Sequence, residues 1–182
     1  MKNRQVLLFV LALTSLAMCS GLSIKCSLDY PVFLGNNFLT QYENFFGLSV
    51  NVKKQLFPIF GISGQIDYQL SRYKRTGVIL DGFTPAVGVN VGNRSGMFVY
   101  ELFAGIGMPI YNYYVKNTNY VNETDFGISP IGSLSLGIAL NDNLSVGLRS
   151  QYSFILFPNN PGNPYDRQTN AWKNGIFLNV NI

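Results

Sequence analysis

The chain has 182 residues, of which 47% are hydrophobic and only 12% are charged, about half the charged share of an ordinary soluble domain. This length argues for one domain, and a net charge of +4 without a dense Lys/Arg run gives little support for nucleic-acid binding. The chain contains no histidine, which excludes a Ser-His or Cys-His catalytic pair and a His-ligated metal site, so we expect no cofactor.

The first residues have the three parts of a secretory signal peptide. A basic start is followed by the apolar run Val6–Leu13 and by the small residues of Ser15–Ala17. The apolar run is too short for a membrane-spanning helix, which needs about 20 residues. We therefore expect a signal peptide over 1–19, with cleavage near Ala17 to Cys19.

Two outcomes are open for Cys19. The segment Leu16–Cys19 resembles a bacterial lipobox, in which Cys19 becomes the lipidated first residue, although Met18 departs from the small residue expected there. Alternatively, the chain is cleaved nearby. Cys26 is then an ordinary small apolar residue, or the partner of a surviving Cys19 in a local disulfide.

The rest of the chain alternates between apolar and small polar residues with a period of two. Because successive side chains on a strand point to opposite faces, this pattern predicts strands with one apolar and one polar face. The weakest segment is the first, where Pro31 cannot donate to a ladder of hydrogen bonds. The predicted strands are Ser23–Leu34, Glu43–Lys53, Ile59–Tyr73, Phe83–Gly92, Met97–Tyr111, Gly127–Leu140, Leu144–Phe157 and a last strand that includes Trp172 and runs to Ile182.

The connections between these segments alternate between short and long. Short turns follow Val52, Gly92 and Leu140. The long connections are Lys74–Gly82, Asn112–Phe126 and Pro158–Asn170. Transmembrane barrels show this asymmetry, with short periplasmic turns, longer outer loops and an even number of strands. We therefore predict an all-β fold, an eight-stranded antiparallel up-and-down transmembrane β-barrel over 24–182.

Charged residues well inside the strong strands all lie on the polar face. A Lys or Arg on the lipid face near the midplane costs ~2–4 kcal/mol, so this face is expected to line the lumen. Unpaired buried charges are very costly. We therefore expect one paired, structural network, whose alternative is a gate or a catalytic acid pair. Its members are Asp67, Glu101, Arg149 and Lys173, with Glu101 and Arg149 at one depth and Asp67 and Lys173 at another.

Aromatic residues gather near the predicted strand ends, as in interfacial girdles. On the short-turn side these are Phe57, Phe60 and Phe98, and on the other side Tyr68, Tyr111, Tyr113, Phe154 and Trp172. Four tyrosines of the long loops are candidate contacts for a partner, with interfacial anchoring as the alternative. They are Tyr113, Tyr114, Tyr120 and Tyr165.

Together these features resemble the small outer-membrane β-barrel domain proteins of Gram-negative bacteria, in the barrel-only style of the Bacteroidetes. The segments Phe60–Tyr73, Tyr100–Pro109 and Gly175–Ile182 carry the likeness. The closing strand keeps the alternation of the assembly signal in such barrels but lacks the terminal aromatic. The resemblance implies location in the bacterial outer membrane, contact with its lipid and folding by the barrel-assembly machinery. It implies no common site residues.

The favoured function is a non-enzymatic barrel with a structural role or with loops that bind an unknown extracellular partner. The alternative is a narrow channel for small or apolar solutes, which Phe103, Phe177 and the charge network would obstruct. Barrel enzymes that modify lipids resemble one another in placing a histidine beside a serine, which this chain lacks. A soluble secreted barrel would need the apolar face to point inward.

Overall fold

The computed structural model describes residues 21–34, 38–73, 78–114, 123–157 and 168–182. The proposed signal peptide and Cys19 lie outside these ranges. No helix of the described residues is long and apolar enough to cross a bilayer. The elements are β1 (Leu22–Leu34), the 3-10 helix η1 (Phe38–Gln41), β2 (Tyr42–Phe57), β3 (Phe60–Tyr73), β4 (Ile79–Ser95), β5 (Phe98–Gly107), β6 (Ile110–Tyr114), β7 (Glu123–Phe126), β8 (Ser129–Ala139), β9 (Leu144–Leu156) and β10 (Gln168–Asn181).

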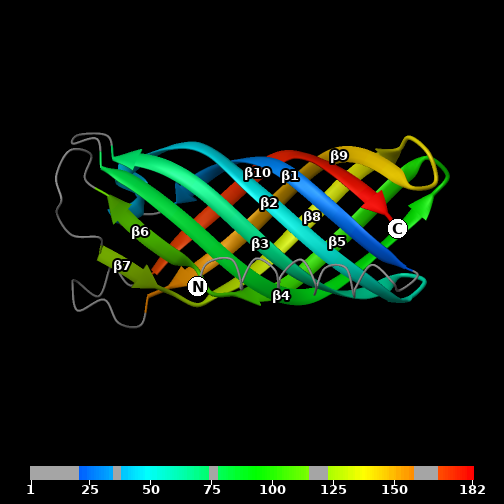
Figure 1. Ribbon diagram of the computed structural model, residues 1–182, viewed down its shortest axis with the longest axis horizontal. Coiled ribbons are helices and arrows are strands. Elements are labelled where there is room, and N and C mark those ends of the chain that lie inside the picture. Colours follow the sequence, from blue (N-terminus) through cyan, green and yellow to red (C-terminus); the bar gives the residue numbers. More distant parts are fainter. Residues whose placement is uncertain (1–20, 35–37, 74–77, 115–122, 158–167) are drawn as a thin grey trace, which may run out of the picture.

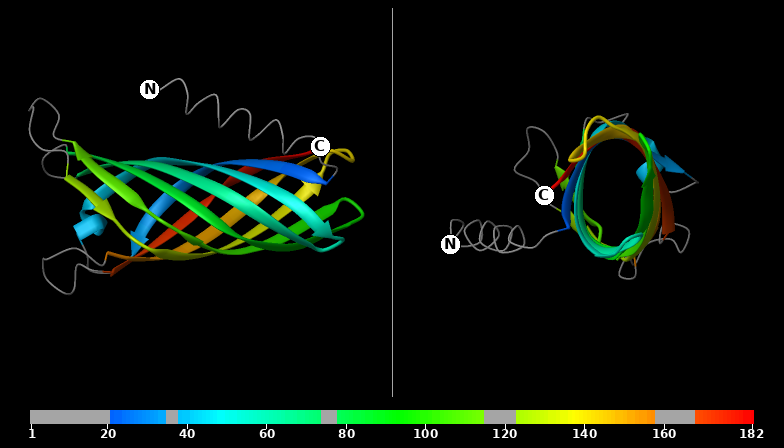
Figure 2. Two further views of the ribbon diagram at one scale, coloured as in Figure 1. Left: turned by 60° about the horizontal axis from the view of Figure 1, so that its bottom comes forward. Right: turned by 90° about the vertical axis from the view of Figure 1, so that its right-hand side faces the viewer.

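The strands form one antiparallel sheet that closes into a barrel (Figures 1 and 2). The order runs β3-β2-β1-β10-β9-β8-β5-β4, and pairing of β3 with β4 completes the ring. Because β6 extends β5 along β4 and β7 extends β8, the segments make eight strands around the barrel. The predicted fold class is confirmed. The weak first strand is also confirmed, since β1 pairs with β10 along its length and seals the barrel.

One predicted strand, Met97–Tyr111, is interrupted. Pro109 separates β5 from β6 because it has no N–H to donate to the ladder. Neighbouring bonds bridge the break: Met108 N donates to Pro85 O at 2.9 Å, and Gly127 N donates to Pro109 O at 2.9 Å. The alternation of faces continues across the break, so Gly107 and Tyr111 both point inward.

The two ends of the barrel differ as the sequence predicts. Short turns join β2 to β3, β4 to β5 and β8 to β9 at the end where the C-terminus lies (Figure 1). In the β4–β5 turn, Gly96 has a φ of 61°, which glycine adopts without strain. At the other end the strands extend into the predicted loops, since β4 begins at Ile79 and β6 and β7 pair. The stretches 74–77, 115–122 and 158–167 lie outside the described residues.

The sequence alternation separates the lumen from the exterior. In β8 the serines Ser129, Ser133 and Ser135 are buried, whereas Leu134 and Leu136 are exposed. Large apolar side chains cover the outside, as Val87 at 70% exposure illustrates. A soluble barrel would require the reverse, so the exterior is that of a protein surrounded by lipid.

Candidate functional site

The lumen is the part of the barrel where polar and charged side chains converge. Three regions follow one another along its axis. At the short-turn end is a cavity that we call the vestibule. Next comes a set of buried ion pairs in the middle of the barrel, the mid-barrel cluster. At the long-loop end, apolar side chains form the outer plug. Each region is built from residues on several strands.

The vestibule has a volume of about 600 Å³. Its lining runs from Pro58 and Asn141 in two short turns, and from Asn93 near the end of β4, down to Lys25 and Glu101. The cavity therefore reaches the short-turn end of the barrel and stops inside the lumen at charged side chains.

Lys25 of β1, Lys53 of β2 and Glu101 of β5 form this vestibule floor. Lys53 Nζ lies 2.5 Å from Glu101 Oε2, and the Lys25 ammonium pairs with the other carboxylate oxygen. Lys25 Nζ also donates to Ser135 Oγ at 3.1 Å. In the ring order β1 and β5 are opposite each other, so the Lys25–Glu101 pair spans the lumen.

The mid-barrel cluster consists of two acids and two cations: Asp29, Asp67, Arg149 and Lys173. Arg149 Nη1 lies 3.3 Å from Asp29 Oδ2, and Arg149 Nη2 lies 3.9 Å from Asp67 Oδ1. Lys173 Nζ lies 3.4 Å from Asp67 Oδ2. None of these side chains is more than 5% exposed. Buried ions at this depth are tolerated because each has an opposite charge beside it.

Two glutamines add hydrogen bonds to Asp67 and Arg149 in the mid-barrel cluster. Gln151 Nε2 donates to Asp67 Oδ2 at 2.7 Å, and its carbonyl accepts from Arg149 and, at 2.8 Å, from Gln65. Gln65 also donates to Asp67 Oδ1 at 3.0 Å. These contacts link β3 to β9 across the barrel and occupy the space between the charges.

Of the four charged residues expected in one network, the structure brings three together. Asp67, Arg149 and Lys173 meet in the mid-barrel cluster, whereas Glu101 belongs to the vestibule floor. Equal distance from a turn does not make Glu101 and Arg149 partners. Ser135 of β8 lies between them, because it pairs with Glu101 on β5 on one side and with Arg149 on β9 on the other.

The sequence prediction did not include Lys25, Asp29 and Lys53. Lys25 and Asp29 lie in the strand with the weakest pattern, although they share one face with Ser23 and Ser27. That alternation of polar residues indicated that Lys25 and Asp29 face the lumen. Lys53 was predicted to lie at the boundary between a strand and a short turn, but β2 continues to Phe57.

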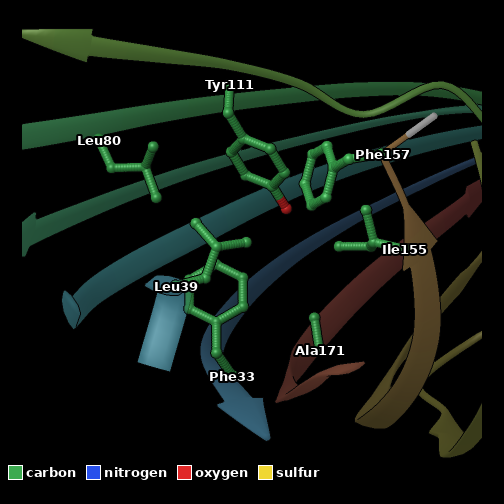
Figure 3. Packing of buried hydrophobic residues seen from close by; sticks show 7 residues of the cluster. All are labelled: Phe33, Leu39, Leu80, Tyr111, Ile155, Phe157 and Ala171. Carbon is green, nitrogen blue, oxygen red and sulfur yellow. The ribbon is translucent and has the colours of Figure 1, made fainter. Parts of the chain in front are cut away.

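The outer plug fills the lumen at the long-loop end. Its members converge from five strands, from η1 and from the residue that follows β9 (Figure 3): Phe33, Leu39, Leu80, Tyr111, Ile155, Phe157 and Ala171. The Tyr111 ring centroid lies 5.9 Å from that of Phe157 and 6.3 Å from that of Phe33. A small cavity of about 10 Å³ is lined by residues of both the outer plug and the mid-barrel cluster, among them Tyr111 and Asp67.

The position of Tyr111 corrects an expectation. An interfacial position was predicted, but Tyr111 is 1% exposed and lies inside the barrel. Side chains alternate between the two faces of a strand, so Tyr111 points inward because Ile110 before it points outward. Phe57, Phe98 and Trp172 are exposed on the exterior, as a girdle requires. Phe103 and Phe177 point into the lumen, as expected.

The remaining candidate residues lie at the outer end or outside the described ranges. Tyr113 and Tyr114 belong to β6, and Tyr113 pairs with Leu80 through the backbone. Tyr120, Tyr165 and Cys19 lie outside the described residues. Cys26 is free and exposed on the outer face of β1. In the described part of the chain, no three His, Cys, Asp or Glu side chains are grouped as a metal site would need.

No protein-family model and no curated protein matches the sequence. Solved structures match the fold. Neisserial surface protein A aligns with a TM-score of 0.68 at 9% identity, covering 90% of this chain and 98% of that one. The attachment invasion locus protein Ail of Yersinia pestis gives 0.55 at 12% identity, covering 89% and 100%. The outer membrane protein OprG of Pseudomonas aeruginosa gives 0.51 at 11% identity, covering 90% and 96%.

These likenesses show a shared fold, that of small eight-stranded outer-membrane barrels. With its apolar exterior and polar lumen, the chain has the architecture of a bacterial outer-membrane protein. A Bacteroidetes origin has no support in the likenesses, which are to proteins of other bacteria.

Proposed function

We propose that this protein is a non-enzymatic, non-conducting barrel of the bacterial outer membrane that presents its outer loops to a partner. The observation that carries the proposal is the obstruction of the lumen. From the short-turn end, a solute would meet the vestibule floor, then the mid-barrel cluster and then the outer plug. A barrel that is closed in this way has its accessible surface at its ends, where loops usually carry function.

The outer end is suited to support loops. The outer plug fixes the strand ends below the long connections, and the β6–β7 hairpin extends the barrel beyond the plug. A firm base reduces the ordering that loops must undergo on binding. The same fold occurs in a protein named for attachment and invasion, so the fold is compatible with a contact role. Lipid of the outer membrane and the barrel-assembly machinery are the other partners of this proposal.

The channel alternative requires a continuous path. Opening one would break buried ion pairs and displace aromatic side chains such as Phe157 and Tyr111. A channel would give steady current steps in a planar bilayer, whereas the proposal predicts none. The chain has no histidine to act beside a serine or cysteine nucleophile. The carboxylates of Asp67 and Glu101 are held in ion pairs, which does not favour a catalytic role for them.

The loop role can be tested by replacing residues 115–122 and 158–167 with short Gly/Ser segments. Cells that display the barrel are applied to wells coated with fibronectin, collagen or heparin, and retained cells are counted. We expect retention by the parent barrel on at least one coating and a loss of at least fivefold when the loops are replaced. The matched control replaces Asn141–Asn143 in a short turn and keeps retention. Heat-modifiable gel migration verifies that each barrel is folded. Equal retention by loop and turn variants would contradict the loop role.

A further inference from the structure

The vestibule has a feature that the loop role does not use. Its floor contains two ammonium groups, from Lys25 and Lys53, and one carboxylate, from Glu101, a formal excess of one positive charge. The mid-barrel cluster has equal numbers of acids and cations, so it does not offset this charge. The other ion pair of the vestibule lining, Arg94 with Asp142 at 3.3 Å, is itself neutral. An unbalanced charge inside a barrel is costly unless an anion reaches it.

Lys53 is the cation that an entering anion can contact. Its side chain is 18% exposed, against 9% for Lys25 and for Glu101, and all three line the vestibule. An ammonium group has three donors, and the bond to Glu101 uses one of them. Lys25, by contrast, is held between Glu101, Ser135 and the ring of Phe177. Asn90 Nδ2 donates to Glu101 Oε1 at 3.0 Å, so Glu101 is held by this amide as well as by both ammonium groups.

The walls of the vestibule determine which anion fits. A volume of about 600 Å³ lies within the ~300–1,000 Å³ that small-molecule sites occupy. Above the charged floor the wall includes the apolar side chains of Leu22, Val99 and Phe177, and the mouth has the amides of Asn93, Asn141 and Asn181. A charged end at the floor and a partly apolar body along the wall would satisfy both regions.

We infer that the vestibule is a binding site for a small organic anion with a phosphate or carboxylate head, entering from the periplasm. The head contacts Lys53 at the floor, and the body lies against Val99 and Phe177. This site is separate from the outer loops, so the inference goes beyond the loop role and does not depend on it. Short turns face the periplasm in outer-membrane barrels, which gives a periplasmic solute direct access.

Phenyl phosphate is the probe, because it combines an anionic head with an apolar ring. Its binding to the purified full-length barrel in zwitterionic detergent is measured by titration calorimetry, with protein-free micelles as the blank. We expect phenyl phosphate to bind at least tenfold more tightly than its neutral counterpart, benzyl alcohol. Inorganic phosphate should bind more weakly than phenyl phosphate, because it makes no contact with the wall.

Three variants locate the site. Lys53→Gln should weaken phenyl phosphate binding at least tenfold, whereas the neighbouring Lys54→Gln, outside the vestibule lining, should leave it unchanged. Glu101→Gln should strengthen binding, because it removes the carboxylate that competes for both ammonium groups. Val99→Phe should weaken the binding of phenyl phosphate more than the binding of inorganic phosphate.

If Glu101→Gln does not fold, the comparison of Lys53→Gln with Lys54→Gln decides. Equal binding of phenyl phosphate and benzyl alcohol, or equal effects of the two lysine variants, would overturn the inference.

Discussion

The mid-barrel cluster and the vestibule floor are both sets of ion pairs inside one lumen, yet they differ in charge balance and in surroundings. The mid-barrel cluster pairs two acids with two cations and is enclosed by Gln65, Gln151 and the outer plug. The floor pairs two cations with one acid below a cavity. A balanced, enclosed set closes the barrel, whereas an unbalanced set beside a cavity is available to a ligand. The same residue types therefore serve different purposes at different depths.

The largest expected loss of stability comes from removing the side chain of Arg149, which contacts both acids of the mid-barrel cluster. Arg149→Ala leaves Asp29 without its cation and Asp67 with only Lys173. Breaking a buried ion pair from one side costs about 3–5 kcal/mol. We expect a fall of that size in the free energy of unfolding, measured with urea in lipid vesicles.

The control for Arg149 is Arg94, whose guanidinium is 43% exposed and pairs with the exposed Asp142 at the rim. Exposed pairs contribute about 0–1 kcal/mol, so Arg94→Ala should have little effect. If both variants lost equal stability, the distinction between buried and exposed pairs in this barrel would fail.

A smaller loss of stability is expected when Gly175 is replaced, because the absence of a side chain at Gly175 allows Asp29 to approach β10. A Cβ at Gly175 would lie 2.1 Å from Leu28 O and 2.4 Å from Asp29 Oδ1. Gly175→Ala should therefore displace the acid and cost about 1–3 kcal/mol, as overpacking does. A Cβ at Gly132 would meet nothing within 4 Å, so Gly132→Ala is the matched control. Urea unfolding that is unchanged for Gly175→Ala would show that Asp29 is not held where the structure places it.

The smallest effect on stability is expected for Lys53→Gln. This variant leaves Lys25 and Glu101 as a balanced pair, so we expect a change below about 1 kcal/mol. Lys173→Gln removes a cation from the balanced cluster and should cost more, because two acids then share Arg149. Comparing the two variants in the same urea assay shows how charge balance affects stability. A larger loss of stability for Lys53→Gln than for Lys173→Gln would contradict the distinction between an unbalanced floor and a balanced mid-barrel cluster.

Much of the barrel could be predicted from the sequence because lipid and lumen impose a period of two on every strand. The placement of Asp67, Arg149 and Lys173 in the lumen follows from that period alone. Which charges meet could not be predicted, because contacts across the lumen depend on strand order around the ring and on register. Glu101 therefore lies with Lys25 and Lys53, not with Arg149. The break at Pro109 had a visible cause, but its effect depended on bonds from other strands.

The position of the vestibule could not be predicted from the sequence for a related reason. Its lining comes from the first and last strands, from two short turns and from strands between them, and the cavity exists only once β1 pairs with β10. The outer plug is a similar case, since Leu39 and Phe157 lie in connections between predicted strands or at their ends.

The central claim is that the lumen does not conduct, and single-channel recording in planar bilayers tests it most directly. The purified barrel is reconstituted at 1 M KCl (a high concentration chosen to reveal small pores), and a general porin serves as the positive control for insertion. We predict a flat current from the parent barrel at either polarity. Steady, reproducible single-channel steps from the parent barrel would contradict the account, because they require a continuous path through the vestibule floor, the mid-barrel cluster and the outer plug.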